Sequence, residues 1–209
     1  MKRILCFGDS NTWGYIPSSD MDRYDVTIRY PRVLASKLGN DYEVIEEGLP
    51  GRTLMSDDFK EMIGNRNGVL SFPQVLYTSL PLDYILIMLG TNDLKFCYAK
   101  TAKECAEVLE SSYIDIIIKK LNGKIKNNPK IIIVAPSILG GLTDKFNDPS
   151  ILESYNFNQE YEKVAKKYNC LFIDNNGLKT GSDNVHLTKE SHLLLGDKIY
   201  KAIKEFEDN

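Results

Sequence analysis

Five short apolar runs recur along the chain, separated by longer segments of mixed polar and apolar residues. The runs cover residues 4–7, 42–45, 84–89, 130–134 and 171–173. Runs that lack alternating polar positions are typical of strands buried on both faces of a parallel sheet. Their alternation with helical segments predicts a doubly wound parallel sheet. Because crossover connections are right-handed and helices cover both faces, the predicted fold class is a three-layer α/β sandwich (αβα) with five strands.

Periodic apolar positions predict helices in the segments between the runs. We expect them over residues 31–38, 72–80, 101–121 and 148–168, and after a cap at Thr188. Pro31 fits the first helical position, and Thr101 with Glu104 forms a capping box at the start of the longest helix. Gly123 is expected to close that helix. Residues 15–29 are expected to form a surface loop at the rim of the sheet.

Length and composition restrict the class of protein. A chain of 209 residues is long enough for one domain with a substantial core, so we expect a single domain over residues 1–209. The net charge of -3 gives no basic surface for nucleic acid. The apolar run after Lys2 and Arg3 is too short for a signal peptide, and no run is long enough to span a membrane. We therefore expect a cytoplasmic protein that binds neither nucleic acid nor membrane.

The cysteines are scattered and show no CxxC spacing. They are Cys6, Cys97, Cys105 and Cys170. In a chain of this size without a signal peptide, such cysteines are expected to be reduced thiols. We expect no disulfide, no metal site and no cofactor.

A group of small polar residues follows the first apolar run. Gly8, Asp9, Ser10 and Asn11 come directly after it, where the carboxyl end of the first strand is expected. Open α/β sheets bind their ligands in the crevice beyond the carboxyl ends of the strands. Ser10 is therefore a candidate nucleophile. The same four residue types also favour an ordinary turn, which is the simplest alternative for this stretch alone.

A serine nucleophile needs a base, and the base needs a third group that orients it. The chain has two histidines, His186 and His192. His192 falls inside the last expected helix as a half-exposed residue, whereas His186 lies in the loop before it, where active-site residues are common. His186 is therefore the preferred base. Asp183, in the same loop, and Asp174, at the end of the fifth strand, are both candidates for the third group.

Three blocks taken together resemble the SGNH (GDSL-type) hydrolase superfamily. They are Gly-Asp-Ser at 8–10, Gly-Thr-Asn-Asp at 90–93 and Asp-Asn-Val-His at 183–186. Residues 3–14, 45–53 and 80–93 resemble its arylesterase/acyltransferase branch. The resemblance implies the flavodoxin-like strand order 2-1-3-4-5, and its Asp-x-x-His spacing favours Asp183 over Asp174 as the acid of the triad.

The resemblance also implies an oxyanion hole. Its donors would be the backbone N–H groups of Ser10 and Gly51 and the side-chain amide of Asn92. Gly48 competes with Gly51 for this role, because a glycine at that position also lets the backbone approach a ligand.

Five further residues are expected near the site. Asp9 and Asp93 are expected to accept backbone N–H bonds of their own turns, and so to hold the nucleophile and the oxyanion-hole amide in place. Asn11, where the superfamily usually has leucine, is expected to line the substrate pocket with Trp13. Tyr15 is expected beside them.

The activity implied by the resemblance is that of a serine esterase that forms an acyl-enzyme on Ser10. Its substrates would be small esters with short acyl groups, and the acyl acceptor would be water or an alcohol. A lysophospholipase or thioesterase and a carbohydrate acetyl esterase are alternatives that use the same site. A flavodoxin-like module that binds a phosphate or cofactor at residues 8–12 is the alternative without catalysis. The resemblance also implies a homo-oligomer whose neighbouring subunits complete the pocket wall.

Overall fold

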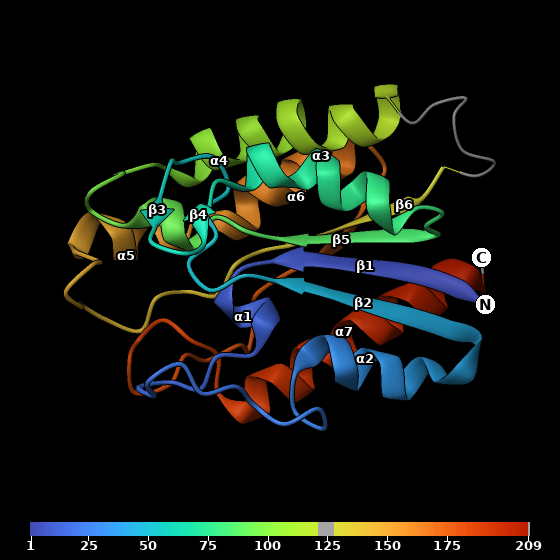
Figure 1. Cartoon of the computed structure of the whole chain (residues 1–209), viewed down its shortest axis with the longest axis horizontal. Helices are drawn as coiled ribbons and strands as arrows, with labels where there is room; N and C mark the ends of the chain where they lie inside the picture. The colour runs from blue at the N-terminus through green and yellow to red at the C-terminus, as the bar shows by residue number, and fades with distance from the viewer. Residues whose placement is uncertain (121–127, 209) are drawn as a thin grey trace.

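A parallel five-stranded sheet lies at the centre of the computed structural model, which describes residues 1–120 and 128–208 (Figure 1). Its strands are β1 (Lys2–Gly8), β2 (Tyr42–Gly48), β5 (Tyr84–Met88), β6 (Lys130–Val134) and β7 (Leu171–Ile173). They lie in the order β2-β1-β5-β6-β7, and every neighbouring pair is parallel. The five apolar runs therefore form the five strands, and the predicted order 2-1-3-4-5 is confirmed.

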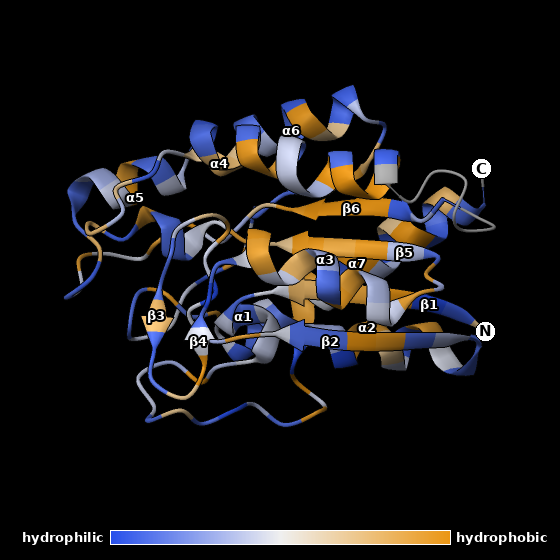
Figure 2. Cartoon of the chain, turned by 45° about the horizontal axis from the view of Figure 1, so that its top comes forward, coloured by the Kyte–Doolittle hydropathy of each residue, from blue (hydrophilic) through white to orange (hydrophobic). Residues whose placement is uncertain are grey.

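Helices cover both faces of the sheet, which confirms the three-layer sandwich (Figure 1). One face carries α3 (Gly68–Ser79), α4 (Ala102–Leu109) and α6 (Phe157–Lys167), and the other carries α2 (Tyr30–Leu38) and α7 (Lys189–Glu207). Successive residues of a strand enter opposite cores. In β1, Leu5 and Phe7 join the first core while Ile4 and Cys6 join the second, and all four are fully buried. Figure 2 shows the apolar strands between the two helical layers.

Three neighbouring strands end level with one another. Gly8 at the end of β1 pairs with Gly48 of β2 and with Met88 of β5. The segments that follow these residues therefore leave the sheet at the same edge, where α1 (Ser10–Trp13) lies (Figure 1). Both ends of the chain lie at the opposite edge.

The predicted helix starts agree with the structure at three positions. Pro31 lies in the first turn of α2. The side chains of Thr101 and Glu104 form the capping box before α4, and the Thr188 hydroxyl caps α7 by accepting a hydrogen bond from the Ser191 N–H. After α4 the chain continues in π-type turns, Glu110–Ile114 and Ile116–Lys120. The expected end of this helix at residues 121–123 lies outside the described residues.

Two other helices differ in extent from the prediction. The helix α3 begins at Gly68 rather than at residue 72, because the Asn67 side chain caps it by accepting a hydrogen bond from the Val69 N–H. The segment 148–168 forms two helices, α5 (Asp148–Ser154) and α6, instead of one. The buried Ser154 hydroxyl at the end of α5 accepts a hydrogen bond from the Leu139 N–H, which anchors the chain at the break.

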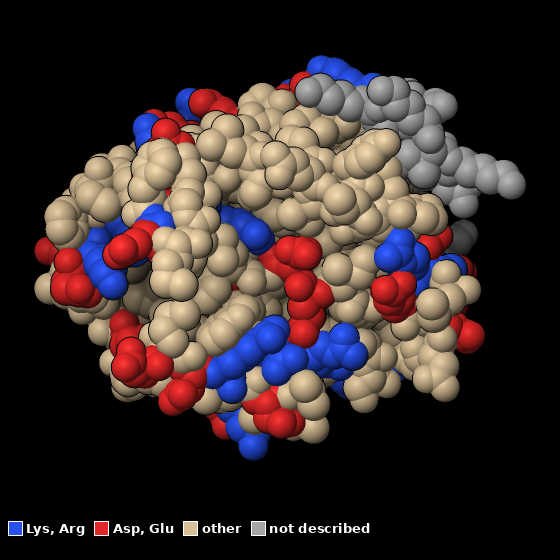
Figure 3. All heavy atoms as spheres, in the orientation of Figure 1, with Lys and Arg blue, Asp and Glu red and all other residues tan. Residues whose placement is uncertain are grey.

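Several short elements were not predicted. They are the single turn α1, the antiparallel pair β3 (Phe59–Lys60) and β4 (Gly64–Asn65), and the 3₁₀ turns Gly39–Asp41 and Thr91–Leu94. Within residues 1–120 and 128–208 no helix has the length and apolar character needed to cross a bilayer. On the face shown in Figure 3, acidic and basic side chains lie next to one another, and the area over α3 is mostly uncharged.

Candidate active site

Ser10 begins α1 at the carboxyl end of β1. Asp9 caps this turn, because its carboxylate accepts a hydrogen bond from the Asn11 N–H at 2.9 Å. A side chain at Gly8 would bring its Cβ within 1.9 Å of the Thr12 hydroxyl, so the turn can lie this close to the strand only with glycine at that position. These contacts hold the Ser10 side chain at the edge of the sheet.

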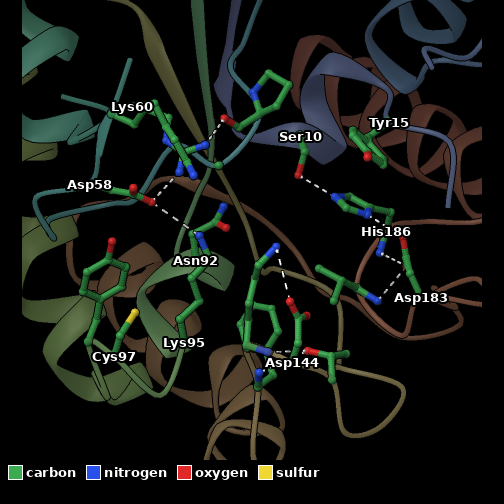
Figure 4. Close-up of a pocket in the computed structure, with 18 of the residues that line it drawn as sticks. Ser10, Tyr15, Asp58, Lys60, Asn92, Lys95, Cys97, Asp144, Asp183 and His186 are labelled. Atoms are coloured by element: carbon green, nitrogen blue, oxygen red, sulfur yellow. Dashed lines mark hydrogen bonds and ion pairs between the residues drawn. The ribbon is translucent and has the colours of Figure 1, made fainter. Parts of the chain in front are cut away.

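A chain of two hydrogen bonds connects Ser10, His186 and Asp183 (Figure 4). His186 Nε2 lies 2.9 Å from the Ser10 Oγ, and His186 Nδ1 lies 2.7 Å from Asp183 Oδ2. The other oxygen of Asp183 accepts the backbone N–H groups of Val185 and His186 at 3.0 and 2.9 Å. The loop thus fixes the carboxylate, and the carboxylate fixes the imidazole.

The protonation state of Asp183 suits this arrangement. Partial burial raises the pKa of the carboxyl, but the hydrogen bonds from the His186 side chain and from the backbone outweigh it, so the pKa lies well below its usual range. An ionised Asp183 keeps the His186 proton on Nδ1. The lone pair on Nε2 then faces the serine hydroxyl, as a general base requires.

The two rival residues lie elsewhere. Asp174 bonds Lys198 Nζ at 2.5 Å and does not contact either histidine. His192 was predicted to be half-exposed, which is wrong, because α7 packs on α2 and buries it completely. Its Nδ1 accepts a hydrogen bond from the Tyr30 N–H at 3.4 Å. Burial lowers the pKa of His192 to about 3, so this histidine is a neutral core residue near neutral pH.

The candidate oxyanion donors follow β2 and β5. Asn92 lies in the 3₁₀ turn Thr91–Leu94 after β5, and its side-chain Nδ2 donates to the Arg52 carbonyl at 3.0 Å. A primary amide has two N–H groups, so a second donor remains on Asn92. Gly51 and Asn92 both line the same cavity as Ser10.

Gly48, the competitor of Gly51, is the last residue of β2. A Cβ at this position would lie 2.2 Å from the Trp13 backbone nitrogen. The need for glycine there is explained by the packing of α1 against β2, and Gly48 does not line the cavity.

Asp93 is fully buried beside Asn92 and joins two segments of the site. It was predicted to accept N–H bonds from its own turn, but its carboxylate instead accepts the backbone N–H groups of Leu54, Met55 and Ser56. The reason is that residues 54–56 fold back against the 3₁₀ turn and have no other partner for these donors in a sheet or helix. Burial raises the pKa of Asp93, although these hydrogen bonds oppose the shift. Asp9, in contrast, caps its own turn as expected.

Asn11 and Trp13 were predicted to line the substrate pocket, but neither is among the residues that line the cavity beside Ser10. Asn11 is buried, and its side-chain oxygen accepts a hydrogen bond from the Leu187 N–H at 2.8 Å. The Arg23 guanidinium lies over the Trp13 ring, 5.2 Å from the ring centre. Tyr15 does line the cavity, and its ring stacks on the His186 imidazole at a centroid distance of 4.2 Å.

A cavity of about 520 Å³ opens beside Ser10 and His186 (Figure 4). Its wall has both apolar and polar surface, and it contains six charged side chains in addition to Asp183: Asp58, Lys60, Arg66, Lys95, Asp144 and Lys145. None of these six residues was predicted from the sequence. No local motif marks these residues, because contacts between distant segments bring them together, as with Lys95 and Asp58 at 3.4 Å. In the part of the chain that the structure describes, no three potential metal ligands come together.

Comparison with known proteins gives one family and several close structures. Residues 6–194 match the model of the GDSL-like Lipase/Acylhydrolase family. A carbohydrate acetylesterase family member from Sinorhizobium meliloti has 32% sequence identity and a TM-score of 0.89, over 98% of both chains. The native aryl esterase of M. smegmatis has 31% identity and a TM-score of 0.88, over 98% of this chain and 99% of that chain. No match to a curated protein was found.

Proposed function

The chain belongs to the GDSL-like lipase/acylhydrolase family, and we propose that it hydrolyses small carboxylic esters with short acyl groups through an acyl-enzyme on Ser10. The observation that carries this proposal is the chain of two hydrogen bonds from Ser10 through His186 to Asp183. Three groups in this order can activate a hydroxyl that is otherwise a poor nucleophile.

Each step of the proposed reaction uses a group already described. His186 Nε2 takes the proton of Ser10 as Oγ attacks the ester carbonyl, and the Ser10 and Gly51 N–H groups and Asn92 bind the resulting oxyanion. His186 then gives its proton to the departing alcohol as the ester C–O bond breaks. Water, deprotonated by His186, attacks the acyl-enzyme and releases the acid and free Ser10.

The cavity wall supports a polar substrate. Six charged side chains would lose hydration against a long acyl chain, and removing charged groups from water is costly even when they are paired, as Asp58 is with Arg66 and Lys95. This disfavours a lysophospholipase or a long-chain thioesterase. A polar alcohol moiety, such as the hydroxyl of a carbohydrate, would keep hydrogen bonds to the same side chains. We therefore propose acetyl esters of polar alcohols as the preferred class, in line with the name of the carbohydrate acetylesterase neighbour.

Labelling with a fluorophosphonate probe tests the proposed mechanism directly. The wild-type protein should be labelled on Ser10, and the Ser10→Ala variant should not. An unlabelled wild-type protein would indicate an inactive relative, and yellow flavin absorbance in the purified protein would favour the flavodoxin-like module instead.

The acyl-chain profile should decline with length. For p-nitrophenyl esters, kcat/KM is expected to be highest for acetyl or butyryl and to fall about tenfold or more by decanoyl, because a longer acyl chain displaces more water from the charged side chains of the wall. Initial rates over the series, with Ser10→Ala as the blank and with and without added alcohol, measure both substrate and acceptor preference. Values that keep rising to decanoyl and beyond would mean a lipase or thioesterase.

Asn92→Ala is expected to lower kcat about 100-fold or more and to change KM much less, because the lost donor acts mainly in the transition state. Steady-state kinetics on p-nitrophenyl acetate measures the effects on kcat and KM separately. Asp93→Ala is the contrasting variant, which should act mainly by lowering the thermal midpoint, since it leaves three backbone donors at Leu54–Ser56 without an acceptor. A change in KM alone for Asn92→Ala would reduce its role to substrate binding.

The remaining expectations concern location and assembly. All four cysteines, which lie in described parts of the chain, are free, and this supports the cytoplasm as the proposed compartment. The mostly uncharged area over α3, with Leu70 and Tyr77 exposed, supports a homo-oligomer (Figure 3). Light scattering on the purified protein measures its mass, and a monomer at all concentrations would rule the oligomer out.

A further inference from the structure

The backbone between Leu49 and Arg52 forms a type II turn. The Arg52 N–H donates to the Leu49 carbonyl at 2.9 Å, proline occupies the second position, and Gly51 at the third has a φ of +79°. Turns of types I and II differ by a flip of their central peptide, here the one between Pro50 and Gly51. This peptide is trans, so its carbonyl and its N–H point in opposite directions. Whatever holds the Pro50 carbonyl therefore also sets the direction of the Gly51 N–H.

The Arg66 guanidinium holds that carbonyl. Its Nη1 donates to the Pro50 oxygen at 3.0 Å, and its Nη2 donates to Asp58 Oδ2 at 2.7 Å. The guanidinium also lies directly against Gly51, since a Cβ built there would be 2.0 Å from Nη1. Only 11% of the Arg66 side chain and 10% of the Asp58 side chain are exposed, so water competes little for these bonds.

Arg66 is itself held in place from several sides. Its backbone N–H donates to the Asp58 carbonyl at 2.9 Å, and its own carbonyl accepts the Thr53 N–H at 3.2 Å. Burial raises the pKa of Asp58, but the hydrogen bond from Arg66 and the charge of Lys95 outweigh it and keep the pKa below its ordinary value. The carboxylate thus stays ionised beside the guanidinium. In Figure 4, Asp58 and Ser10 lie on opposite sides of the cavity, with Asn92 between them.

We propose that Arg66 is a positioning residue, which fixes the peptide between Pro50 and Gly51 so that the Gly51 N–H is directed toward the oxyanion. The inference rests on the proposed function, because it assigns a cause to one of the donors used there. Glycine at position 51 makes both orientations of the peptide accessible. The planar Arg66 guanidinium, which bonds both Asp58 and the Pro50 carbonyl, selects one of them. The segment around β3 and β4, which carries Asp58 and Arg66, thereby contributes to the chemistry without touching the substrate's reacting carbon.

Removing the guanidinium should weaken binding of the transition state and leave ground-state binding nearly intact. For Arg66→Met we expect kcat on p-nitrophenyl acetate to fall about 10- to 100-fold and KM to stay within about threefold, since one oxyanion donor is misdirected rather than deleted. The inhibition constant of phenylboronic acid, whose serine adduct is tetrahedral and anionic, should rise by the same factor as kcat/KM falls. A general loss of folded protein would lower the active-site titre without moving either constant.

Double-mutant cycles identify the donor through which Arg66 acts. A side chain at position 51 already displaces the guanidinium in Gly51→Ala. Adding Arg66→Met to that variant should therefore lower kcat by less than about a further threefold. Adding Arg66→Met to Asn92→Ala should lower kcat by the same factor as Arg66→Met lowers it in the wild-type protein, because Asn92 is a separate donor. The proposal would be overturned by the opposite pattern, in which adding Arg66→Met lowers kcat fully in the Gly51→Ala background and not at all in the Asn92→Ala background.

Arg66→Lys provides a variant that keeps the positive charge beside Asp58 and is therefore expected to fold. An ammonium is a point charge on a flexible stem and does not reproduce the planar fork, so kcat should still fall about tenfold. Wild-type kcat in Arg66→Lys would show that only charge matters and would overturn the proposal. These outcomes are separate from a failure of the proposed function, in which the wild-type protein itself would neither turn over the ester nor react with the fluorophosphonate.

Discussion

Ser10→Ala and His186→Ala are each expected to abolish turnover, a loss on the order of 10⁶-fold in kcat. In the proposed mechanism the hydroxyl attacks only when the imidazole accepts its proton, and without the hydroxyl the imidazole has no nucleophile to activate. His186 Nε2 and the Ser10 Oγ, 2.9 Å apart, therefore act as one unit. The double variant should be little worse than either single variant, because the second change removes a function that is already lost.

Hydrolysis of p-nitrophenyl acetate measures this loss, with circular dichroism to show that each variant is folded. The second histidine gives a matched control. His192→Gln alters a buried residue that does not contact Ser10, so it should lower the thermal midpoint and leave kcat within about threefold of wild type. More than a few per cent of activity in Ser10→Ala would mean that the reaction does not proceed through an acyl group on this serine.

Asp183→Asn is expected to lower kcat about 10⁴-fold while the protein remains folded. The carboxylate accepts the Nδ1 hydrogen of His186, whereas an amide can present its N–H₂ group there and stabilise the tautomer with the proton on Nε2. That tautomer has no lone pair facing Ser10. KM on the same ester should change little, because the substrate does not depend on the tautomer for binding.

The equivalent change at Asp174 is the control for Asp183→Asn. Asp174 has a carboxylate of the same kind near the end of β7, but it is bound to Lys198. Asp174→Asn should therefore have only a small effect on kcat and cost about 1 kcal/mol or less in stability, as is usual for a partly exposed ion pair. The reverse order of the two variants in side-by-side kinetics would assign the role of acid to Asp174.

The parts of the site that could be predicted from the sequence depend on short-range patterns. The strand before Ser10 is a continuous apolar run, and Asp183 and His186 are three positions apart in one loop, so their contact requires no knowledge of the fold. The exposure of His192 was predicted wrongly, because a helical position alone does not reveal that α7 packs on α2 at that point.

The cavity wall could not be predicted, because its residues come from irregular segments that meet only after folding. Arg66 contacts Pro50 and Asp58, and Asp58 also contacts Lys95, which follows β5. None of these contacts repeats along the sequence with the period of a helix or a strand. Asn11 illustrates the same limit, because a polar residue beside the proposed nucleophile suggests a pocket, whereas its actual partner is the distant Leu187 N–H.

The hydrogen bond from the Leu187 N–H to Asn11 joins positions 176 residues apart, directly beside His186 and Ser10. Ordering the histidine loop beside the serine lowers the conformational entropy of the chain. Because this bond holds the loop in the folded protein, that entropy is lost once, on folding, and not again in each catalytic cycle. It also does not involve the serine hydroxyl. In the proposed acyl-enzyme, where Oγ carries the acyl group and no longer donates to the imidazole, the loop keeps this attachment. The imidazole is then already in position when the water molecule of the second half-reaction arrives.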